Sequence, residues 1–358
     1  MKKISFPWLA LIFVICLSLI STSCAGGEQN SGGGTALSQA NSPNGASGQP
    51  ISVNLKAATS NTQTSVYLFT AALGEILSEA KPIKINLDIL PYAGAIGNVE
   101  LVTRKEADFA TSFNVTNKWA YDGVVAYDHK FEDIRGLVGG LNQYYVGIIA
   151  SDEFLKKYNL TSLAQIKEKK IPVRIITNTV GTLAEFNTRH VLQAYGLNDE
   201  MIKSFGGSVE FTSNDVIKAK FQNGTADLHI LAMTKAHPVI TEIALQTDIA
   251  VLPLEDITTD LFKQYGYTQE VFPKGEFKGQ SEDIHTVGFV TGYITHKDMS
   301  DEVAYTITKA VVENKAALVY GHKSVEDFDP QKAADPDSLG IPLHPGAVRY
   351  YKEVGILK

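Results

Sequence analysis

Small polar residues stand where an apolar, strand-like run meets a helical pattern. The run Ile171–Ile176 leads into Thr177, Asn178, Thr179, Val180, Gly181 and Thr182, after which Leu183 and Phe186 fall on one helical face. Thr and Asn cap helices, because their side-chain oxygens accept the free backbone N–H groups of the first turn. The same N–H groups, with the helix dipole, also favour an anion. The loop therefore has two interpretations, a helix cap or an anion-binding site.

The composition is that of a globular protein that does not bind nucleic acid. The chain has 358 residues, of which 44% are hydrophobic and 20% charged, and this length allows two domains. Its formal net charge is −7, and no block of Lys or Arg interrupts the sequence. Without such a block, little would drive the counterion release on which binding to phosphates depends.

The N-terminal residues predict export. A basic start, Lys2 and Lys3, precedes the apolar run Ile4–Ile20 and then small residues that end at Cys24, so we interpret residues 1–23 as a lipoprotein signal peptide. An uncleaved membrane anchor is the alternative. Cys16 and Cys24 are the two cysteines of the chain, and Cys24 is the predicted lipidation site. Residues 24–50 are rich in Gly, Ser, Asn and Gln, which predicts a flexible tether.

The remaining chain alternates strand-like and helix-like patterns. Strands are predicted at 51–57, 83–89, 107–111, 138–150, 171–176, 228–232, 249–252 and 284–295, and helices at 66–77, 98–105, 216–221 and 300–320. Short connections between alternating elements indicate an α/β fold with mainly parallel sheets. We expect two such units, with the chain crossing between them near residues 150 and 288. Ligands in these folds bind at the carboxyl ends of strands.

The sequence offers no recognisable catalytic or metal motif. GxSxG, GxxxxGK, GxGxxG and HExxH are absent, and the eight histidines are scattered, His229 and His237 among them. We therefore expect a binding protein with no catalytic residue, no metal and no cofactor.

Several longer motifs resemble the TAXI family of extracytoplasmic solute receptors, which serve TRAP transporters. The most specific is GIPLHPGAVRYYKEVGI at 340–356, and EDIHTVGFVTGYITHKDMSDEVAYTITKAVVEN at 282–314, HPVITEIA at 237–244 and GNVELVTRKEADFA at 97–110 also match. The resemblance implies a two-lobed type II periplasmic-binding-protein fold. Lobe 1 would comprise residues 51–150 and 289–358, and lobe 2 residues 151–288.

The resemblance also implies a function. The protein would be a monomer outside the cytoplasm, anchored by lipid to the bacterial cell membrane. It would capture glutamate, glutamine or a related C5 dicarboxylate and deliver it to the membrane permease of a TRAP transporter. Three alternatives remain: a ligand-sensing subunit of a signalling system, an enzyme on the same two-lobed fold, and a surface adhesin.

The loop Thr177–Thr182 stands where the family has a loop that binds the ligand carboxylate. Carried over to this sequence, the resemblance implies a ligand site made of Asn61, Thr62, Tyr67, Tyr92, Gly94, Ala95, Asn114, Asn178, Thr179, Val180, Gly181, Thr182 and Thr234. Tyr144 and Tyr145 are further candidates for ring faces and hydroxyls. In the first lobe the family has a Gly-Gly-Thr-Tyr-Tyr loop, whereas this chain reads Gln63-Thr64-Ser65-Val66-Tyr67. Gln63 and Thr64 would fill the space that two glycines leave for a ligand.

The lipid anchor gives the first testable prediction. Cys24→Ala removes the thiol that would carry the lipid, so we expect the protein to leave the membrane fraction of lysed cells. A membrane fraction unchanged by this substitution would instead indicate an uncleaved helical anchor.

Overall fold

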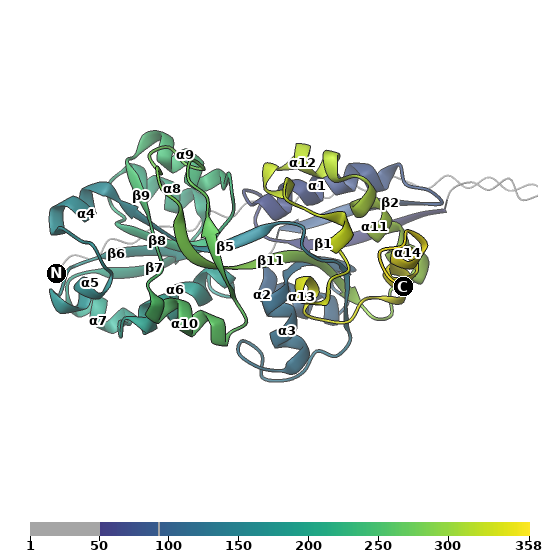
Figure 1. Cartoon of the computed structure of the whole chain (residues 1–358), viewed down its shortest axis with the longest axis horizontal. Coiled ribbons are helices and arrows are strands. Elements are labelled where there is room, and N and C mark those ends of the chain that lie inside the picture. Colours follow the sequence, from purple (N-terminus) through teal and green to yellow (C-terminus); the bar gives the residue numbers. More distant parts are fainter. Residues whose placement is uncertain (1–50, 92–93) are drawn as a thin grey trace, which may run out of the picture. The chain divides into compact units, whose positions relative to one another are not determined.

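The structure, a computed structural model, describes residues 51–91 and 94–358. The predicted signal peptide (1–23), the predicted tether (24–50) with Cys24, and Tyr92 lie outside the described residues. Within them, strands and helices alternate as the sequence pattern predicts, and the fold is α/β (Figure 1). None of the described helices combines the length and the apolar character that crossing a bilayer requires.

Eleven strands are found in the described residues. They are β1 (Ile51–Thr59), β2 (Ile83–Pro91), β3 (Phe109–Phe113), β4 (Ile134–Val138), β5 (Gln143–Ser151), β6 (Arg174–Asn178), β7 (Ser208–Thr212), β8 (Leu228–Met233), β9 (Ile249–Leu252), β10 (Thr268–Phe272) and β11 (Ile284–His296).

The helices lie between these strands and after the last of them. They are α1 (Ser65–Ser78), α2 (Ala95–Thr103), α3 (Asn114–Asp122), α4 (Asp152–Tyr158), α5 (Ala164–Glu168), α6 (Leu183–Ala194), α7 (Asp199–Ser204), α8 (Asn214–Gln222), α9 (Pro238–Gln246), α10 (Asp256–Gln264), α11 (Asp301–Glu313), α12 (Lys315–Gly321), α13 (Pro336–Leu339) and α14 (Pro345–Glu353). Two short 3-10 helices, Lys323–Val325 and Pro330–Lys332, stand between α12 and α13.

The strands form two groups that share β11. The main path of hydrogen-bonded neighbours is β2-β1-β3-β11-β5-β8-β6-β7. The C-terminal half of β11 pairs with β3 and β4, and its N-terminal half pairs with β5 and β10. We call the elements around β1–β4 the first lobe and those around β5–β10 the second lobe (Figure 1). One continuous strand thus connects the two.

The sheet is mixed. Parallel pairing joins β1 to β2 and β3, and β6 to β7 and β8, as expected for strand–helix–strand units. Every antiparallel pair within the described chain includes β5 or β11. These two strands therefore run against their neighbours and account for the difference from a mainly parallel sheet.

Two predicted elements are interrupted in the structure. The predicted strand 138–150 is two strands, since β4 ends at Val138 and β5 begins at Gln143. Gly140 between them has φ +66°, a left-handed conformation that a strand does not contain. The predicted helix 300–320 is likewise two helices, because Asn314 leaves the helical region at φ −119° and ψ 35°.

The predicted lobe boundaries remain a prediction. Residue 150 falls inside β5 and residue 288 inside β11, so neither coincides with a break in secondary structure. β5 pairs with β8 and β9 along most of its length.

A buried asparagine fixes α2 against the ends of two strands. The Nδ2 group of Asn98 donates to the carbonyl of Thr111 at 2.9 Å and approaches those of Ala58 and Thr59 at 3.4 and 3.3 Å. Asn98 is fully buried. This contact sets where α2 begins relative to the carboxyl ends of β1 and β3.

We expect Asn98→Ala to lower the free energy of unfolding by about 1–3 kcal/mol, because buried carbonyl groups lose their donor. Asn86→Ala is the matched control, since Asn86 is exposed and bonds to Asn54 on the surface. The control should change stability by less than about 0.5 kcal/mol in urea unfolding. Equal losses in both variants would contradict a special role for Asn98.

Candidate ligand-binding site

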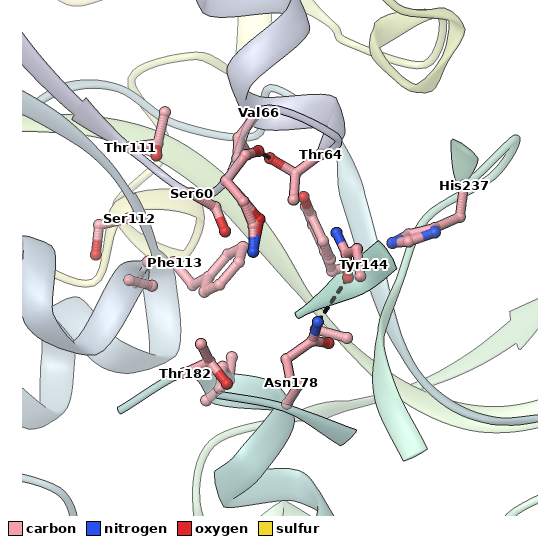
Figure 2. Close-up of a pocket in the computed structure, with 17 residues that line it drawn as sticks. Ser60, Thr64, Val66, Thr111, Ser112, Phe113, Tyr144, Asn178, Thr182 and His237 are labelled. Atoms are coloured by element: carbon pink, nitrogen blue, oxygen red, sulfur yellow. Dashed lines mark hydrogen bonds between the residues drawn. The ribbon is translucent and has the colours of Figure 1, made fainter. Parts of the chain in front are cut away.

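A cavity lies between the two lobes at the carboxyl ends of their strands. It has a volume of about 70 Å³. Its lining comprises Ser60, Asn61, Thr64, Val66, Gly94, Ala95, Thr111, Ser112, Phe113, Tyr144, Asn178, Thr182, Leu183, Ala184, Asn214, Ala232 and His237. Figure 2 shows Ser60 and Thr64 on one side of this space, and Asn178 and Thr182 on the other.

Helix N-termini from both lobes reach the cavity. The first lobe contributes the starts of α1, α2 and α3 through Thr64, Gly94 and Phe113. The second lobe contributes the starts of α6, α8 and α9 through Thr182, Asn214 and His237. Each helix N-terminus carries unpaired N–H groups and a partial positive charge. The cavity is therefore surrounded by hydrogen-bond donors and favours a negative ligand.

No lysine, arginine, aspartate or glutamate belongs to the described lining of this cavity. The titratable groups in it are Tyr144 and His237. Burial raises the pKa of Tyr144 to about 12, and its hydroxyl lies 2.8 Å from the Ser65 hydroxyl. Burial, then the nearby His229 and His322, lower the pKa of His237 to about 3. Both groups are therefore uncharged near neutral pH.

The two lobes carry the same loop at equivalent places. In the first lobe the Thr64 hydroxyl donates to the Asn61 carbonyl at 2.7 Å and accepts the Tyr67 N–H at 3.4 Å. In the second lobe the Thr182 hydroxyl donates to the Thr179 carbonyl at 2.8 Å and accepts the Glu185 N–H at 3.2 Å. Each Thr is the N-cap of the helix that follows its strand.

The two loops differ in charge at the third helical position. The Glu185 carboxylate accepts the N–H of Gly181 at 2.8 Å, so an internal carboxylate already lies on that donor. The first-lobe loop has Tyr67 at the position of Glu185, and neither α1 nor α2 has an acidic residue in its first turn. α8, by contrast, has Asp215 in its first turn.

The structure brings together some of the predicted ligand-binding residues. Asn61, Gly94, Ala95, Asn178 and Thr182 line the cavity. The side chain of Asn178 donates to that of Asn214 at 2.7 Å across the second-lobe edge (Figure 2).

The other predicted residues lie elsewhere, and Tyr92 is outside the described residues. Thr62, Thr179 and Val180 are exposed, and Tyr67 and Gly181 are half-buried without lining the cavity. Asn114 accepts the Val290 N–H at 3.0 Å and donates to the Asp337 carbonyl at 3.0 Å, which is a structural role. Thr234 is fully buried and also outside the lining, as is Tyr145, whose ring contacts Phe272.

Sequence reasoning missed Ser60, Thr111, Ser112, Asn214 and His237. The first three follow or end a predicted strand, at the edge where ligands bind in such sheets. Their position relative to strands 51–57 and 107–111 was a usable signal. Asn214 and His237 belong to helix starts whose approach to the cavity depends on tertiary packing. Among the described residues, no group of three or more His, Cys, Asp or Glu side chains is arranged to hold a metal ion.

The fold is that of periplasmic binding proteins. A solved structure of the periplasmic binding protein BugD matches with a TM-score of 0.50 at 13% identity, covering 86% of this chain and 99% of that one. MatC (Rpa3494) from Rhodopseudomonas palustris with bound malate matches with a TM-score of 0.49 at 12% identity, covering 79% of this chain and 94% of that one. The aliphatic sulphonate binding protein SsuA from Escherichia coli matches with a TM-score of 0.43 at 13% identity, covering 85% of this chain and 84% of that one.

A sequence model of the NMT1-like family matches residues 57–355. The chain belongs to this family. The match spans nearly all of the described residues, both lobes included.

Thr182→Val tests whether the second-lobe loop is a helix cap. Loss of the cap should lower the free energy of unfolding by about 1 kcal/mol and leave ligand affinity nearly unchanged. Thermal unfolding and calorimetry on the same preparation measure both quantities. Affinity weakened about ten- to hundred-fold would instead show that this hydroxyl binds the ligand carboxylate.

Proposed function

We propose that the protein is an extracytoplasmic solute-binding receptor for a small carboxylate. The observation that carries this proposal is the cavity between the lobes, which is surrounded by helix N-termini and whose lining, among the described residues, has no Lys, Arg, Asp or Glu. Backbone N–H groups and dipoles at helix starts bind anions without a cationic side chain. The family and the fold support a binding role.

The carboxylate lies at the first-lobe end of the cavity. The starts of α1 and α2 meet there, and neither has an acidic residue in its first turn. Within the described chain, the amides of Ser65, Val66, Ala95 and Ile96 have no protein partner. The second-lobe end is less favourable for a carboxylate, because Glu185 and Asp215 stand in the first turns of α6 and α8.

The two lobes close on the ligand. Hydrogen bonds between the lobes already join them: the Gln63 amide donates to the Asp215 carboxylate at 2.8 Å, and, away from the cavity lining, the Trp119 indole donates to the Tyr265 carbonyl at 2.8 Å. A cavity of about 70 Å³ then admits a compact ligand. The TAXI resemblance implies glutamate, glutamine or a related C5 dicarboxylate as the class of ligand.

Delivery to a membrane permease of the TRAP type is the transport step of this proposal. The receptor would be a monomer, held at the outer side of the cell membrane through Cys24. The first alternative, a ligand-sensing subunit, differs from this receptor only in its partner. The second, an enzyme, differs from it because it would convert the bound ligand. Gene neighbours that encode a large permease would support transport, and a histidine-kinase neighbour would support sensing.

Mass spectrometry of small molecules that co-purify with the folded protein tests the function. We expect a carboxylate of low mass, bound unchanged at one molecule per chain, and calorimetry with that compound should reproduce the binding. A co-purifying cation or neutral sugar, or conversion of the bound compound, would contradict the proposal.

Ser60→Asp tests where the carboxylate lies. The Ser60 hydroxyl is 3.5 Å from the point where a Cβ on Gly94 would stand, so the new carboxylate would lie at the start of α2. We expect the dissociation constant of the co-purified carboxylate to rise at least about tenfold, since like charges then compete for the same donors.

Ser213→Asp is the matched control, with the same charge change at the N-cap of α8 in the second lobe. Ser213 is exposed, and the substitution should change affinity less than about threefold, a free-energy difference of well under 1.4 kcal/mol. If Ser213→Asp weakened ligand binding more than Ser60→Asp, the carboxylate would instead lie in the second lobe.

A further inference from the structure

His237 departs from a pattern that other histidines of this chain follow. His237 and His344 are both N-caps, and each precedes a proline at the first helical position, in α9 and α14. In α14 the Nδ1 atom of His344 accepts the Gly346 N–H at 3.2 Å. His296 and His322 accept the N–H two residues ahead in the same way, each at 3.1 Å.

The His237 ring makes no such cap. α9 has no side-chain capping bond, and the Nδ1 atom of His237 is buried without any hydrogen-bond partner. The residue is only 7% exposed, and it lines the cavity, as Tyr144 does (Figure 2). A buried polar side chain without a partner is uncommon in folded proteins and calls for a reason.

The enclosure of Nδ1 determines which nitrogen carries the proton. A neutral imidazole has one N–H donor and one bare acceptor nitrogen. Buried N–H groups without an acceptor are rarer than buried acceptors without a donor, so the bare nitrogen is Nδ1. The ring is neutral near physiological pH, because its burial lowers the pKa to about 3. The proton therefore lies on Nε2.

The Nε2 atom has no hydrogen-bond partner in the part of the chain that the structure describes, and it is not among the enclosed atoms. We infer that His237 is a specificity-determining residue whose Nε2–H donates to a neutral oxygen at the end of the ligand opposite its carboxylate. This inference rests on the proposed function and adds the chemistry of the second end of the ligand.

The charges around the second-lobe end define the class of that oxygen. The acidic first-turn residues Glu185 and Asp215 pair with Arg189 at 2.7 Å and with Lys218 at 3.3 Å, so neither cation is free to pair with a second carboxylate there. A neutral N–H donor suits a hydroxyl or carbonyl oxygen. The ligand is thus a short monocarboxylate with a hydroxyl or carbonyl group at its far end, rather than a dicarboxylate.

The tautomer is tested directly by long-range ¹H–¹⁵N NMR of the ¹⁵N-labelled protein, with the His237 signals assigned by their loss in His237→Gln. We expect a neutral ring with the proton on Nε2, unchanged between about pH 5.5 and 8. A proton on Nδ1, or a charged ring in this range, would overturn the inference whatever the ligand proves to be.

Ligand selectivity is tested by calorimetry with pentanoate, 5-hydroxypentanoate and glutarate, which share a five-carbon chain. The wild-type protein should bind 5-hydroxypentanoate at least about tenfold more tightly than pentanoate, and glutarate no better than 5-hydroxypentanoate. Equal affinities for pentanoate and 5-hydroxypentanoate would overturn the role of His237. Failure to bind any of the three would count against the carboxylate function itself, while the NMR result would still decide the tautomer.

A matched pair of variants separates the two ring nitrogens. Gln places its amide nitrogen near Nε2, whereas Asn reaches only the position of Nδ1. His237→Gln should keep the preference for 5-hydroxypentanoate, and His237→Asn should lose it. His344→Gln, which loses the Nδ1 cap of α14, should lower the melting temperature and leave the preference intact. If His237→Gln and His237→Asn preferred 5-hydroxypentanoate over pentanoate equally, the assignment of the donor role to Nε2 would be contradicted.

Discussion

The direction of the chain through its sheets fixes the chemistry of the cavity. In each strand–loop–helix unit the helix begins where the strand ends, so the carboxyl edge of a sheet is also the edge where helix N-termini gather. β1, β3, β6 and β8 all end at the cavity, and the helices that follow them present N–H groups to it. The antiparallel strands β5 and β11 hold the two carboxyl edges face to face. A donor-rich space follows from this arrangement, and no lysine or arginine belongs to the part of its lining that the structure describes.

Acidic side chains in the second lobe make the two halves of the site unequal, and the clearest case is Glu185. The loops that end at Thr64 and Thr182 have the same hydrogen bonds, and they differ at Tyr67 and Glu185. In the second lobe the Glu185 carboxylate takes up the Gly181 N–H and pairs with Arg189 at 2.7 Å. A loop with an acid of its own stabilises its helix, whereas a loop without one leaves its donors to a ligand. In the function that we propose, this difference turns a nearly symmetric pair of loops into one carboxylate end and one neutral end.

Much of the fold could be predicted from the sequence, because alternating patterns and helix caps are local features. The strands at 51–57, 83–89, 228–232 and 249–252 are confirmed, and so is the helix at 216–221. The breaks at Gly140 and Asn314 were not predicted, and the first of them depends on packing against a distant segment. The amide of Gly139, for instance, donates to the carbonyl of Ala333.

The site was predictable only in part. Asn61, Gly94, Ala95, Asn178 and Thr182 follow strands, and the sequence pattern places such residues at the carboxyl edge. The bond from Gly181 to Glu185 could have been suspected from the spacing of Thr182 and Glu185, which is that of a capping box. His237 could not be assigned, because its role depends on a missing bond that only the three-dimensional structure reveals.

The central claim is that a carboxylate lies at the starts of α1 and α2, and backbone amide NMR during titration with the co-purified ligand tests it most directly. Charge-assisted hydrogen bonds are short and strong, and they move an amide proton signal downfield. The account predicts large downfield shifts for some of Ser65, Val66, Ala95 and Ile96, with small changes at Val180, Gly181 and Thr182. Large shifts at the second-lobe loop, with none at α1 and α2, would contradict it.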